Sequence, residues 1–215
     1  MKRFLSIFIL LVMVLLTACG GASDEPERID FHKGSYVLLW KNEDGKVIRE
    51  ENYDHDEWDS CFEYEYNEIG KRAMMRKLDE DGEEIFHTCY YYEDGVKAKE
   101  EYYEKGILGS ITEYDADGRM IHTENYDENG NIKSWSQLVE VDDKEATFYY
   151  DGNDILKNVR IFTNGADGKL TSYYFFFDEE GYLTEIRERH SSIDREVTDP
   201  NEIDQALTLL YPFSE

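Results

Sequence analysis

Glu113-Tyr114-Asp115-Ala116-Asp117-Gly118-Arg119-Met120 is the stretch that decides the fold, because most of the chain repeats its pattern. The Asp115 side chain can accept hydrogen bonds from the backbone ahead of it, and Gly118 can adopt a positive φ without a steric penalty. A type I turn followed by a left-handed glycine is a standard connection of a β-hairpin. The stretch therefore predicts the end of one strand, a tight turn and the start of the next strand.

This Asx-x-x-Gly signature recurs along the chain at a regular spacing. Clear copies are Asn42–Gly45, Asn67–Gly70, Asp79–Gly82, Asp115–Gly118, Asp127–Gly130 and Asp178–Gly181, and looser copies end at Gly95, Gly106, Gly152 and Gly168. From Gly82 to Gly130 the glycines are 13, 11, 12 and 12 residues apart, which allows one strand and one turn per repeat but no helix. The sequence therefore predicts an all-β fold, an antiparallel β-meander of repeated strand–turn units. About thirteen strands are expected, which favours a curled or single-layer sheet.

The turn positions also predict which residues face one another across each hairpin. Counting outward from the turn at Asp115, Tyr114 faces Met120 and Thr112 faces His122. An aromatic residue often precedes the Asx residue, as Tyr114 does, and it can pack against the residue two positions after the glycine. We expect these aromatic pairs to fix the strand register.

The residues Ile111–Met120 resemble the tyrosine–aspartate (YD) repeat of Rhs-type cell-surface proteins, whose units read approximately Tyr-Asp-x-x-Gly-Arg-Leu. Tyr126–Ile132 is a second close match, and Phe177–Leu183 and Leu78–Gly82 are partial matches. The extra glycine usual within each strand pair of that family is mostly absent. The resemblance implies repeated strand–turn units over approximately residues 35–190, and it implies no catalytic residue.

The N-terminus has the features of a bacterial secretion signal. After two basic residues, the uncharged apolar run Phe4–Leu16 is 13 residues long, shorter than the about 20 residues that span a bilayer as a helix. Leu16-Thr17-Ala18-Cys19 resembles a lipobox, which implies cleavage just before Cys19 and a diacylglyceryl thioether on its sulfur. More than one acyl chain on one residue gives stable anchoring. We therefore expect residues 1–18 to be a signal peptide and Cys19 to attach the protein to the extracytoplasmic face of the cell membrane.

The remaining chain is expected to have three parts. Residues 19–31 contain the lipidated cysteine and a polar, flexible tether, residues 32–190 form the β-repeat domain, and residues 191–215 form a C-terminal segment. In that segment Asp199-Pro200-Asn201-Glu202 combines a helix N-cap, a proline at the first helical position and an acidic capping-box residue. Apolar residues follow at helical spacing, so a short helix is expected over about residues 200–211, covering the last edge or one end of the sheet.

The strongly acidic composition restricts the class of partner. Removal of the two basic residues of the signal peptide would change the formal net charge from −26 to −28. Binding to nucleic acid or to an anionic lipid surface requires clustered lysine and arginine, so no nucleic-acid partner is expected. The acidity can serve solubility and protect strand edges from pairing, or it can attract a cationic partner.

Cys61 and Cys89 are not expected to form a disulfide. The turn positions place Cys61 opposite Lys77 and Cys89 opposite Ala73, with one strand between the two cysteines. Strands two apart are separated by about 9.6 Å, whereas a disulfide requires Cα atoms within about 7 Å.

Metal-binding and catalytic patterns are missing from the sequence. Asp79-x-Asp81-Gly82 and Asp115-x-Asp117-Gly118 begin like calcium loops, but Tyr90 and Tyr126 occupy the position that requires glutamate. The five histidines are scattered without zinc-ligand spacing, and no nucleophile elbow, His-Glu-x-x-His, P-loop or dinucleotide fingerprint occurs. We therefore expect no metal site, no cofactor and no enzymatic activity.

The aromatic residues are the remaining functional signal. The chain has 17 Tyr, 11 Phe and 3 Trp, concentrated in the expected strands. They can serve cross-strand packing, or they can form a binding surface, for which the candidate residues are Trp40, Trp58, Tyr91, Trp135 and Tyr174. The first hypothesis is a lipid-anchored binding or scaffold protein with an unknown protein or glycan partner. The alternatives are a carbohydrate or cell-wall binding module that uses exposed Tyr and Trp, and an envelope hydrolase that uses acidic residues.

Overall fold

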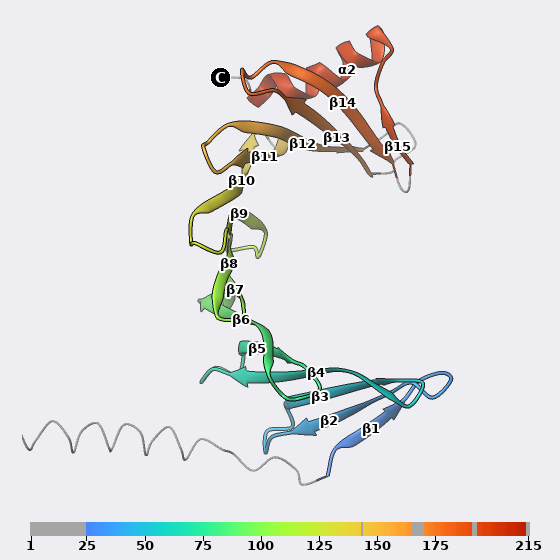
Figure 1. Cartoon of the computed structure of the whole chain (residues 1–215). Coiled ribbons are helices and arrows are strands. Elements are labelled where there is room, and N and C mark those ends of the chain that lie inside the picture. The colour runs from blue at the N-terminus through green and yellow to red at the C-terminus, as the bar shows by residue number, and fades with distance from the viewer. Residues whose placement is uncertain (1–24, 143, 165–169, 191–192, 214–215) are drawn as a thin grey trace, which may run out of the picture. The chain divides into compact units, whose positions relative to one another are not determined.

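The computed structural model describes residues 25–142, 144–164, 170–190 and 193–213 (Figure 1). Cys19, the expected signal peptide and the turn expected at Gly168 lie outside these residues. Within the described ranges, no helix is long and apolar enough to cross a membrane.

Most of the described chain is strand, and a single helix follows near the C-terminus. The first strands are β1 (Glu27–Asp30), β2 (Tyr36–Lys41), β3 (Val47–Asp54), β4 (Glu57–Tyr66), β5 (Arg72–Leu78) and β6 (Glu84–Glu93). The next are β7 (Val96–Glu104), β8 (Ile107–Tyr114), β9 (Met120–Tyr126), β10 (Ile132–Val141) and β11 (Lys144–Asp151). The last elements are β12 (Leu156–Asn164), β13 (Leu170–Phe177), β14 (Leu183–His190), β15 (Ile193–Glu196), the helix α2 (Pro200–Leu210) and the 3₁₀ turn η1 (Tyr211–Phe213).

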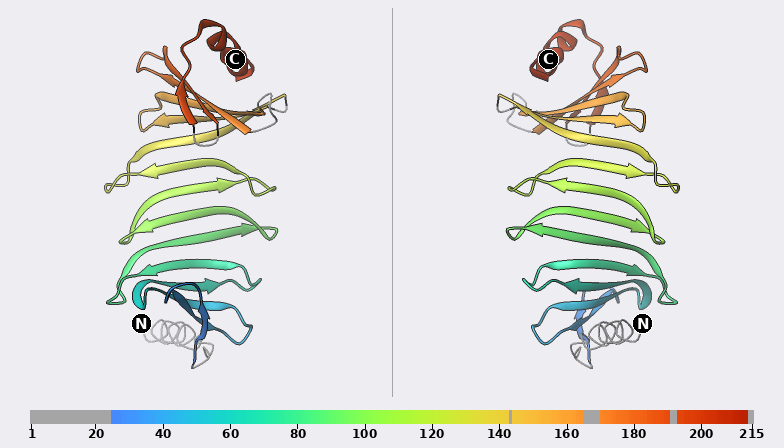
Figure 2. Two further views of the ribbon diagram at one scale, coloured as in Figure 1. Left: turned by 90° about the vertical axis from the view of Figure 1, so that its right-hand side faces the viewer. Right: turned by 90° about the vertical axis from the view of Figure 1, so that its left-hand side faces the viewer.

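The strands follow one another in the sheet in the same order as in the chain, from β1 to β15, without a crossover. The sheet is an open antiparallel meander, and this confirms the predicted fold class. The chain divides into two compact units, Met1–Cys89 and Tyr90–Glu215. Within each unit the turns lie alternately at the two ends of the strands (Figure 2).

The Asx-x-x-Gly turns have the geometry that their sequence predicts. At Asp115 the Gly118 N–H donates to the Asp115 carbonyl oxygen at 2.9 Å, and Gly118 has a φ of 79°. The Asp115 carboxylate accepts the backbone N–H groups of Arg119 and Asp117 at 2.9 and 3.0 Å, and the Arg119 donor is the main reason why the pKa of Asp115 is lowered. The same turn bond and left-handed glycine occur at Asn42–Gly45, Asn67–Gly70, Asp79–Gly82, Asp127–Gly130 and Asp178–Gly181.

Other connections are shorter, and the turn that begins at Asp151 has a residue other than glycine in its left-handed position. His55-Asp56, Asp94-Gly95 and Lys105-Gly106 have positive φ at both positions, the conformation of a two-residue type I′ hairpin turn. Asp54 and Glu57, on either side of His55-Asp56, belong to strands β3 and β4. In the turn that begins at Asp151, Asp154 takes the left-handed position with a φ of 63°, and not Gly152 as the sequence suggested.

The predicted register is correct beside each turn and wrong beyond it. Tyr114 faces Met120 as expected, but Thr112 faces Thr123 and not His122. One extra residue of the second strand, here Ile121, is unpaired, which shifts all later pairs by one residue. The same irregularity occurs in nine of the hairpins, at Ile48, Asp59, Ala73, Ile85, Gly109, Ile121, Lys133, Lys157 and Thr184. A bulge of this kind increases the local right-handed twist of a hairpin, so the repeated unit consists of a turn and a bulge.

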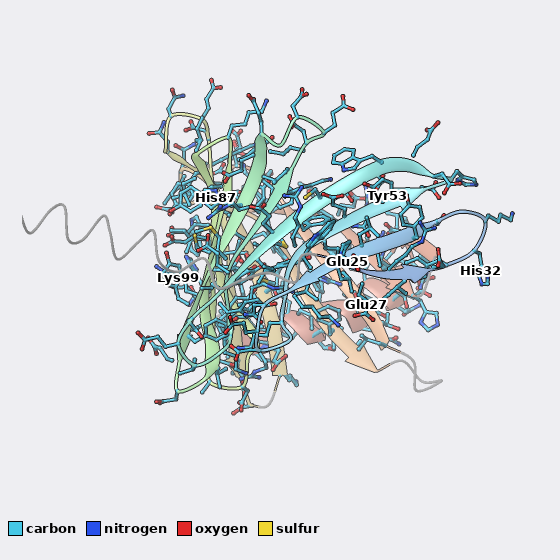
Figure 3. The ribbon with its side chains drawn as sticks, turned by 90° about the horizontal axis from the view of Figure 1, so that it is seen from below. Glu25, Glu27, His32, Tyr53, His87 and Lys99 are labelled. Carbon is cyan, nitrogen blue, oxygen red and sulfur yellow. The ribbon has the colours of Figure 1, made fainter. Side chains whose placement is uncertain are left out.

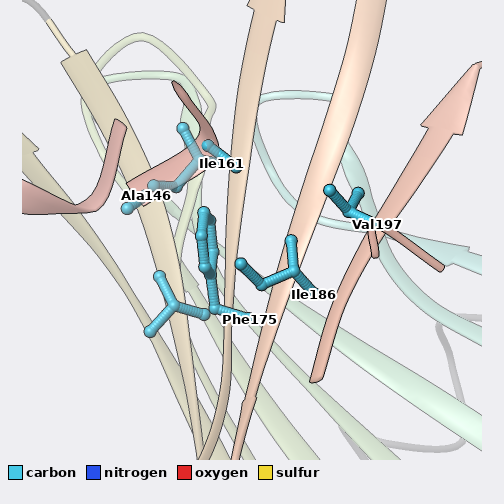
Figure 4. Close-up of a cluster of buried hydrophobic side chains, with 7 residues drawn as sticks. Ala146, Ile161, Phe175, Ile186 and Val197 are labelled. Atoms are coloured by element: carbon cyan, nitrogen blue, oxygen red, sulfur yellow. The ribbon is translucent and has the colours of Figure 1, made fainter. Parts of the chain in front are cut away.

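The second unit has a hydrophobic core where α2 packs on one face of β11–β14. Phe175 and Val159 have no exposed surface, and Ala206 of α2 is buried with them. The Phe175 side chain lies among Ala146, Ile161 and Ile186 (Figure 4). The strands at this end therefore have an apolar face with a helical cover, while the other described strands of this unit have more polar faces.

The boundaries of the expected parts need three corrections. Glu27–Asp30 belongs to strand β1, so the segment expected as a flexible tether ends in a strand that pairs with β2. Ile193–Glu196 forms strand β15, so the C-terminal segment adds a strand before its helix. Asp199 caps α2 as predicted, accepting from the N–H groups of Asn201 and Glu202, but the helical backbone continues beyond Leu210 as the 3₁₀ turn η1, which includes Pro212.

The two cysteines of the sheet are thiols, as expected. The pairing differs from the prediction by the one-residue shift of the bulges: Cys61 faces Leu78 and Cys89 faces Met74. Strand β5 still lies between them, and this separation excludes a disulfide. Burial raises the pKa of the Cys61 thiol.

Candidate functional site

The sheet of the second unit has two chemically different faces. Side chains alternate between the faces of a strand, as the sticks on both sides of the strands show in Figure 3. We call the face that contains Phe175 and carries α2 the helix face, and the opposite face, which contains Tyr174, the open face.

On the helix face, three donors hold Glu101 of β7, two from its own strand and one from β6. Its carboxylate accepts from Lys99 Nζ at 2.8 Å, from the Tyr91 hydroxyl at 2.8 Å and from the Tyr103 hydroxyl at 3.0 Å. Burial alone would raise the pKa of Glu101, but these donors stabilise the charged form and lower it. With three of its about four acceptor positions used, this carboxylate is a structural group and a poor proton acceptor.

On the helix face, a row of residues that face one another across strands β7–β10 leads from Glu101 to Trp135. Glu101 faces Ile111, Ile111 faces Glu124, and Glu124 faces Trp135. The Tyr126 hydroxyl donates to Glu124, and burial together with this bond raises the pKa of Tyr126 to about 12. This part of the helix face is thus a preformed array of bonded carboxylates and aromatic rings.

Contacts to its ring and to its indole nitrogen hold the Trp135 side chain in place. Its ring stacks on Tyr150 with centroids 4.0 Å apart, and its Nε1 donates to the Asp154 carboxylate at 2.9 Å. His122 lies on the other side, with ring centroids 5.8 Å apart. The Trp135 ring is therefore held rigidly at the surface, next to the part of the sheet that α2 covers.

The first unit carries a similar ladder of paired charges. Arg49 bonds Glu51 at 2.7 Å and Glu63 at 2.9 Å, and Arg76 pairs with Glu65. The Tyr53 hydroxyl donates to Glu51 at 3.0 Å. In both units, a glutamate therefore accepts a hydrogen bond from the hydroxyl of the tyrosine two residues later. The three cases are Glu51-x-Tyr53, Glu101-x-Tyr103 and Glu124-x-Tyr126. Sequence reasoning missed this pattern, although the Glu-x-Tyr spacing is visible.

A cavity of about 410 Å³ lies between α2 and strands β12–β15. Its two carboxylates, Glu188 and Glu202, both bind Arg195, and the Tyr173 hydroxyl donates to Glu188 at 3.3 Å. Burial, and then the Glu188 charge, raise the pKa of Tyr173. Because one guanidinium satisfies both carboxylates, the arrangement attaches α2 to β14 and β15, and it lacks the separation of roles that an acid–base pair requires.

The structure does not bring the five candidate surface residues together. Trp40 and Trp58 belong to the first unit, where Trp40 faces Arg49 and Trp58 faces Tyr53. In the second unit, Tyr91 and Trp135 lie on the helix face, whereas Tyr174 lies on the open face. The turn residues Asp115, Gly118, Asp127, Gly130, Asp178 and Gly181 form turns as expected. No group of His, Cys, Asp and Glu with metal-site geometry occurs among the residues that the structure describes.

Comparison with known proteins gives weak structural similarities only. No model of a known family and no curated protein matches the chain. Similar solved structures include a crystal structure of TcdB2-TccC3-Cdc42 (TM-score 0.31, 16% identity, 76% of this chain and 9% of that chain). Others are TcdB2-TccC3 (TM-score 0.26, 9% identity, 79% and 15% of the two chains) and a porin-like protein from Bacteroides uniformis (TM-score 0.28, 10% identity, 79% and 91%). This chain thus spans a small part of the first two, and TM-scores of 0.31 and lower assign neither a family nor a function.

Proposed function

We propose that this protein is a membrane-anchored extracytoplasmic lipoprotein whose β-sheet is a binding or scaffold surface without enzymatic activity. The observation that carries the proposal is Glu101, whose carboxylate is already bonded by three side chains. A rigid, internally bonded surface suits recognition or support, because little conformational freedom is lost when a partner binds it.

The anchor rests on the sequence, because Cys19 precedes the described residues. The lipobox resemblance at Leu16–Cys19 and the short apolar run before it support attachment through acyl chains. Strand β1 begins at Glu27, so only a short segment would separate the membrane surface from the sheet.

Metabolic labelling with radioactive palmitate, followed by membrane fractionation, tests the anchor. The wild-type protein should incorporate label and remain in the membrane fraction at high salt, and the Cys19→Ala variant should lose both properties. Cys61→Ala is the matched control, because it removes a thiol within the sheet and should leave the labelling unchanged. Equal labelling or equal membrane retention of Cys19→Ala and wild type would overturn the proposal.

A carbohydrate-binding module is the second candidate function. The stack of Trp135 on Tyr150, with exposed Tyr91 on the same face, is the observation that favours it. The envelope hydrolase is less well supported, since the two carboxylates of the cavity beneath α2 share one guanidinium.

A further inference from the structure

The open face of the second unit carries an arginine in unusual surroundings. Arg160 of β12 faces Thr147 of β11 on one side and Tyr174 of β13 on the other. Tyr174 in turn faces Arg187 of β14. Because Ile161 and Phe175 belong to the core beneath α2, Arg160 and Tyr174 point away from the helix.

Aromatic rings lie against the Arg160 guanidinium. Its central carbon lies 4.1 Å from the centroid of the Phe162 ring and 5.2 Å from that of Tyr174. Arg160 Nε is buried and has no hydrogen-bond partner. No ion pair of Arg160 occurs among the described residues, whereas its neighbour Arg187 is bonded to Glu185 at 2.5 Å.

The lack of a counter-ion stands out in this composition. The chain has 49 acidic and 23 basic residues, so most arginines can be expected to find a carboxylate partner. Uncharged residues lie beside Arg160 on this face, namely Thr147, Asn158, Phe162, Ser172, Tyr174 and Phe176. Glu145, two residues before Thr147 on the same face, is diagonal to Arg160 and is bonded to Arg119. A partly desolvated charge without a partner is unfavourable, and an anionic ligand would supply the missing partner.

We propose that Arg160, Phe162 and Tyr174 form a binding site for the carboxylate-bearing sugar of an acidic polysaccharide. A guanidinium donates two parallel hydrogen bonds to a carboxylate. The two rings offer flat apolar surfaces against which the C–H face of a sugar can pack, and amide and hydroxyl groups nearby can bond its hydroxyls. Phe162 is 42% exposed, so a ligand has access to its ring.

The ligand class depends on the proposed extracytoplasmic location, where acidic polysaccharides occur. Helix α2 covers the opposite face of these strands, so a linear chain can cross the open face without meeting the helix. The strongly negative net charge repels a long polyanion at low salt. Short acidic oligosaccharides are therefore the ligands expected to bind best.

Titration calorimetry with trigalacturonate tests this site, using the full-length protein extracted from membranes in detergent. We expect saturable binding by wild type and no binding of the neutral trisaccharide maltotriose. Arg160→Gln should weaken binding at least about tenfold. Arg160→Lys keeps the charge but loses the planar guanidinium with its two parallel donors, so it should show an intermediate loss of affinity. The control Arg28→Gln removes an exposed arginine of β1 that is paired with Asp30, and it should leave the affinity unchanged.

The outcomes separate this inference from the proposed function. No saturable binding by wild type, or equal affinity of Arg160→Gln with an unchanged thermal midpoint, would overturn the site. Tighter binding of a hexaglutamate peptide than of trigalacturonate would overturn the sugar class, and concentration-dependent dimerisation lost in Arg160→Gln would replace the ligand with a second copy of the chain. A protein that incorporates palmitate at Cys19 but fails these tests keeps the proposed anchor and loses only this inference.

Discussion

Thr112 of β8 lies opposite Thr123 of β9, with the two hydroxyl oxygens 3.4 Å apart. The turn at Asp115 alone would place His122 there, so the pair exists because Ile121 is an unpaired bulge residue. A shift by one residue moves every later side chain of a strand to the other face of the sheet. The bulge thus places His122 and Glu124 on the helix face, beside Trp135.

Removing the carboxylate of a turn should destabilise its hairpin. The Asp127 carboxylate accepts the N–H groups of Asn129 and Asn131, both at 2.9 Å, so Asp127→Ala should lower the free energy of unfolding by about 1 kcal/mol. Urea unfolding followed by far-UV circular dichroism measures this. Glu128→Ala in the same turn is the control and should have almost no effect, and equal effects of the two variants would contradict the prediction.

The two phenylalanines on opposite faces of the second unit should differ strongly in their contribution to stability. Phe175 has no exposed surface within the core, so Phe175→Ala should cost about 3–5 kcal/mol. Phe162 is 42% exposed, and Phe162→Ala should cost far less. Thermal unfolding of the two variants gives the comparison, and similar midpoints would show that α2 does not cover a core around Phe175.

The fold could be predicted from the sequence because its signals are local. Gly118 and Asp115 determine a turn within four residues, and their repetition determines a meander. The bulge at Ile121 was not predictable, because an ordinary strand residue occupies it and no residue type marks the position. Strand β1 was also missed, since Glu27–Asp30 is short and charged, the composition of a protected edge strand.

The chemistry of the surface depended on contacts between strands, which the sequence does not reveal. Tyr91 reaches Glu101 from another strand, and the sequence gives no reason to associate these two residues. Arg160 has an ordinary sequence environment, and only the register shows that its neighbours across the strands are uncharged. The aromatic candidates were therefore identified by residue type, and the face on which each lies came from the structure.

Glu101 should make stability depend on acidic pH. Its pKa in the folded protein is lowered from the ordinary value of 4.5, so its contribution is present above that value and is lost as pH falls through the folded pKa. Glu101→Gln should therefore be less stable than wild type at neutral pH, and the difference should shrink at about pH 3. Urea midpoints at both pH values test this, with exposed Glu113→Gln as the control. If the stability difference between Glu101→Gln and wild type stays constant with pH, this would contradict a lowered pKa of Glu101.

The contribution of Tyr126 to stability should depend on pH in the opposite direction, and at alkaline pH. Burial and the bond to Glu124 raise its pKa from 10.0 to about 12. Because the folded pKa is raised, the contribution of the neutral phenol is present below pH 10 and is lost as pH rises through about 12. The ¹³Cζ chemical shift of Tyr126, assigned by its absence in Tyr126→Phe, follows the titration directly.

Glu124→Gln separates the two causes of this shift. The amide removes the negative acceptor but leaves the ring in place, so the pKa of Tyr126 should fall toward its ordinary value while burial keeps it from reaching that value. Glu128→Gln, in the turn that follows Tyr126, removes a charge that makes no bond to the phenol, and the titration should remain as in wild type. If both variants shift the titration equally, general repulsion among the acidic residues causes the raised pKa. If only Glu124→Gln changes the titration, the hydrogen bond between Tyr126 and Glu124 on the helix face causes the raised pKa.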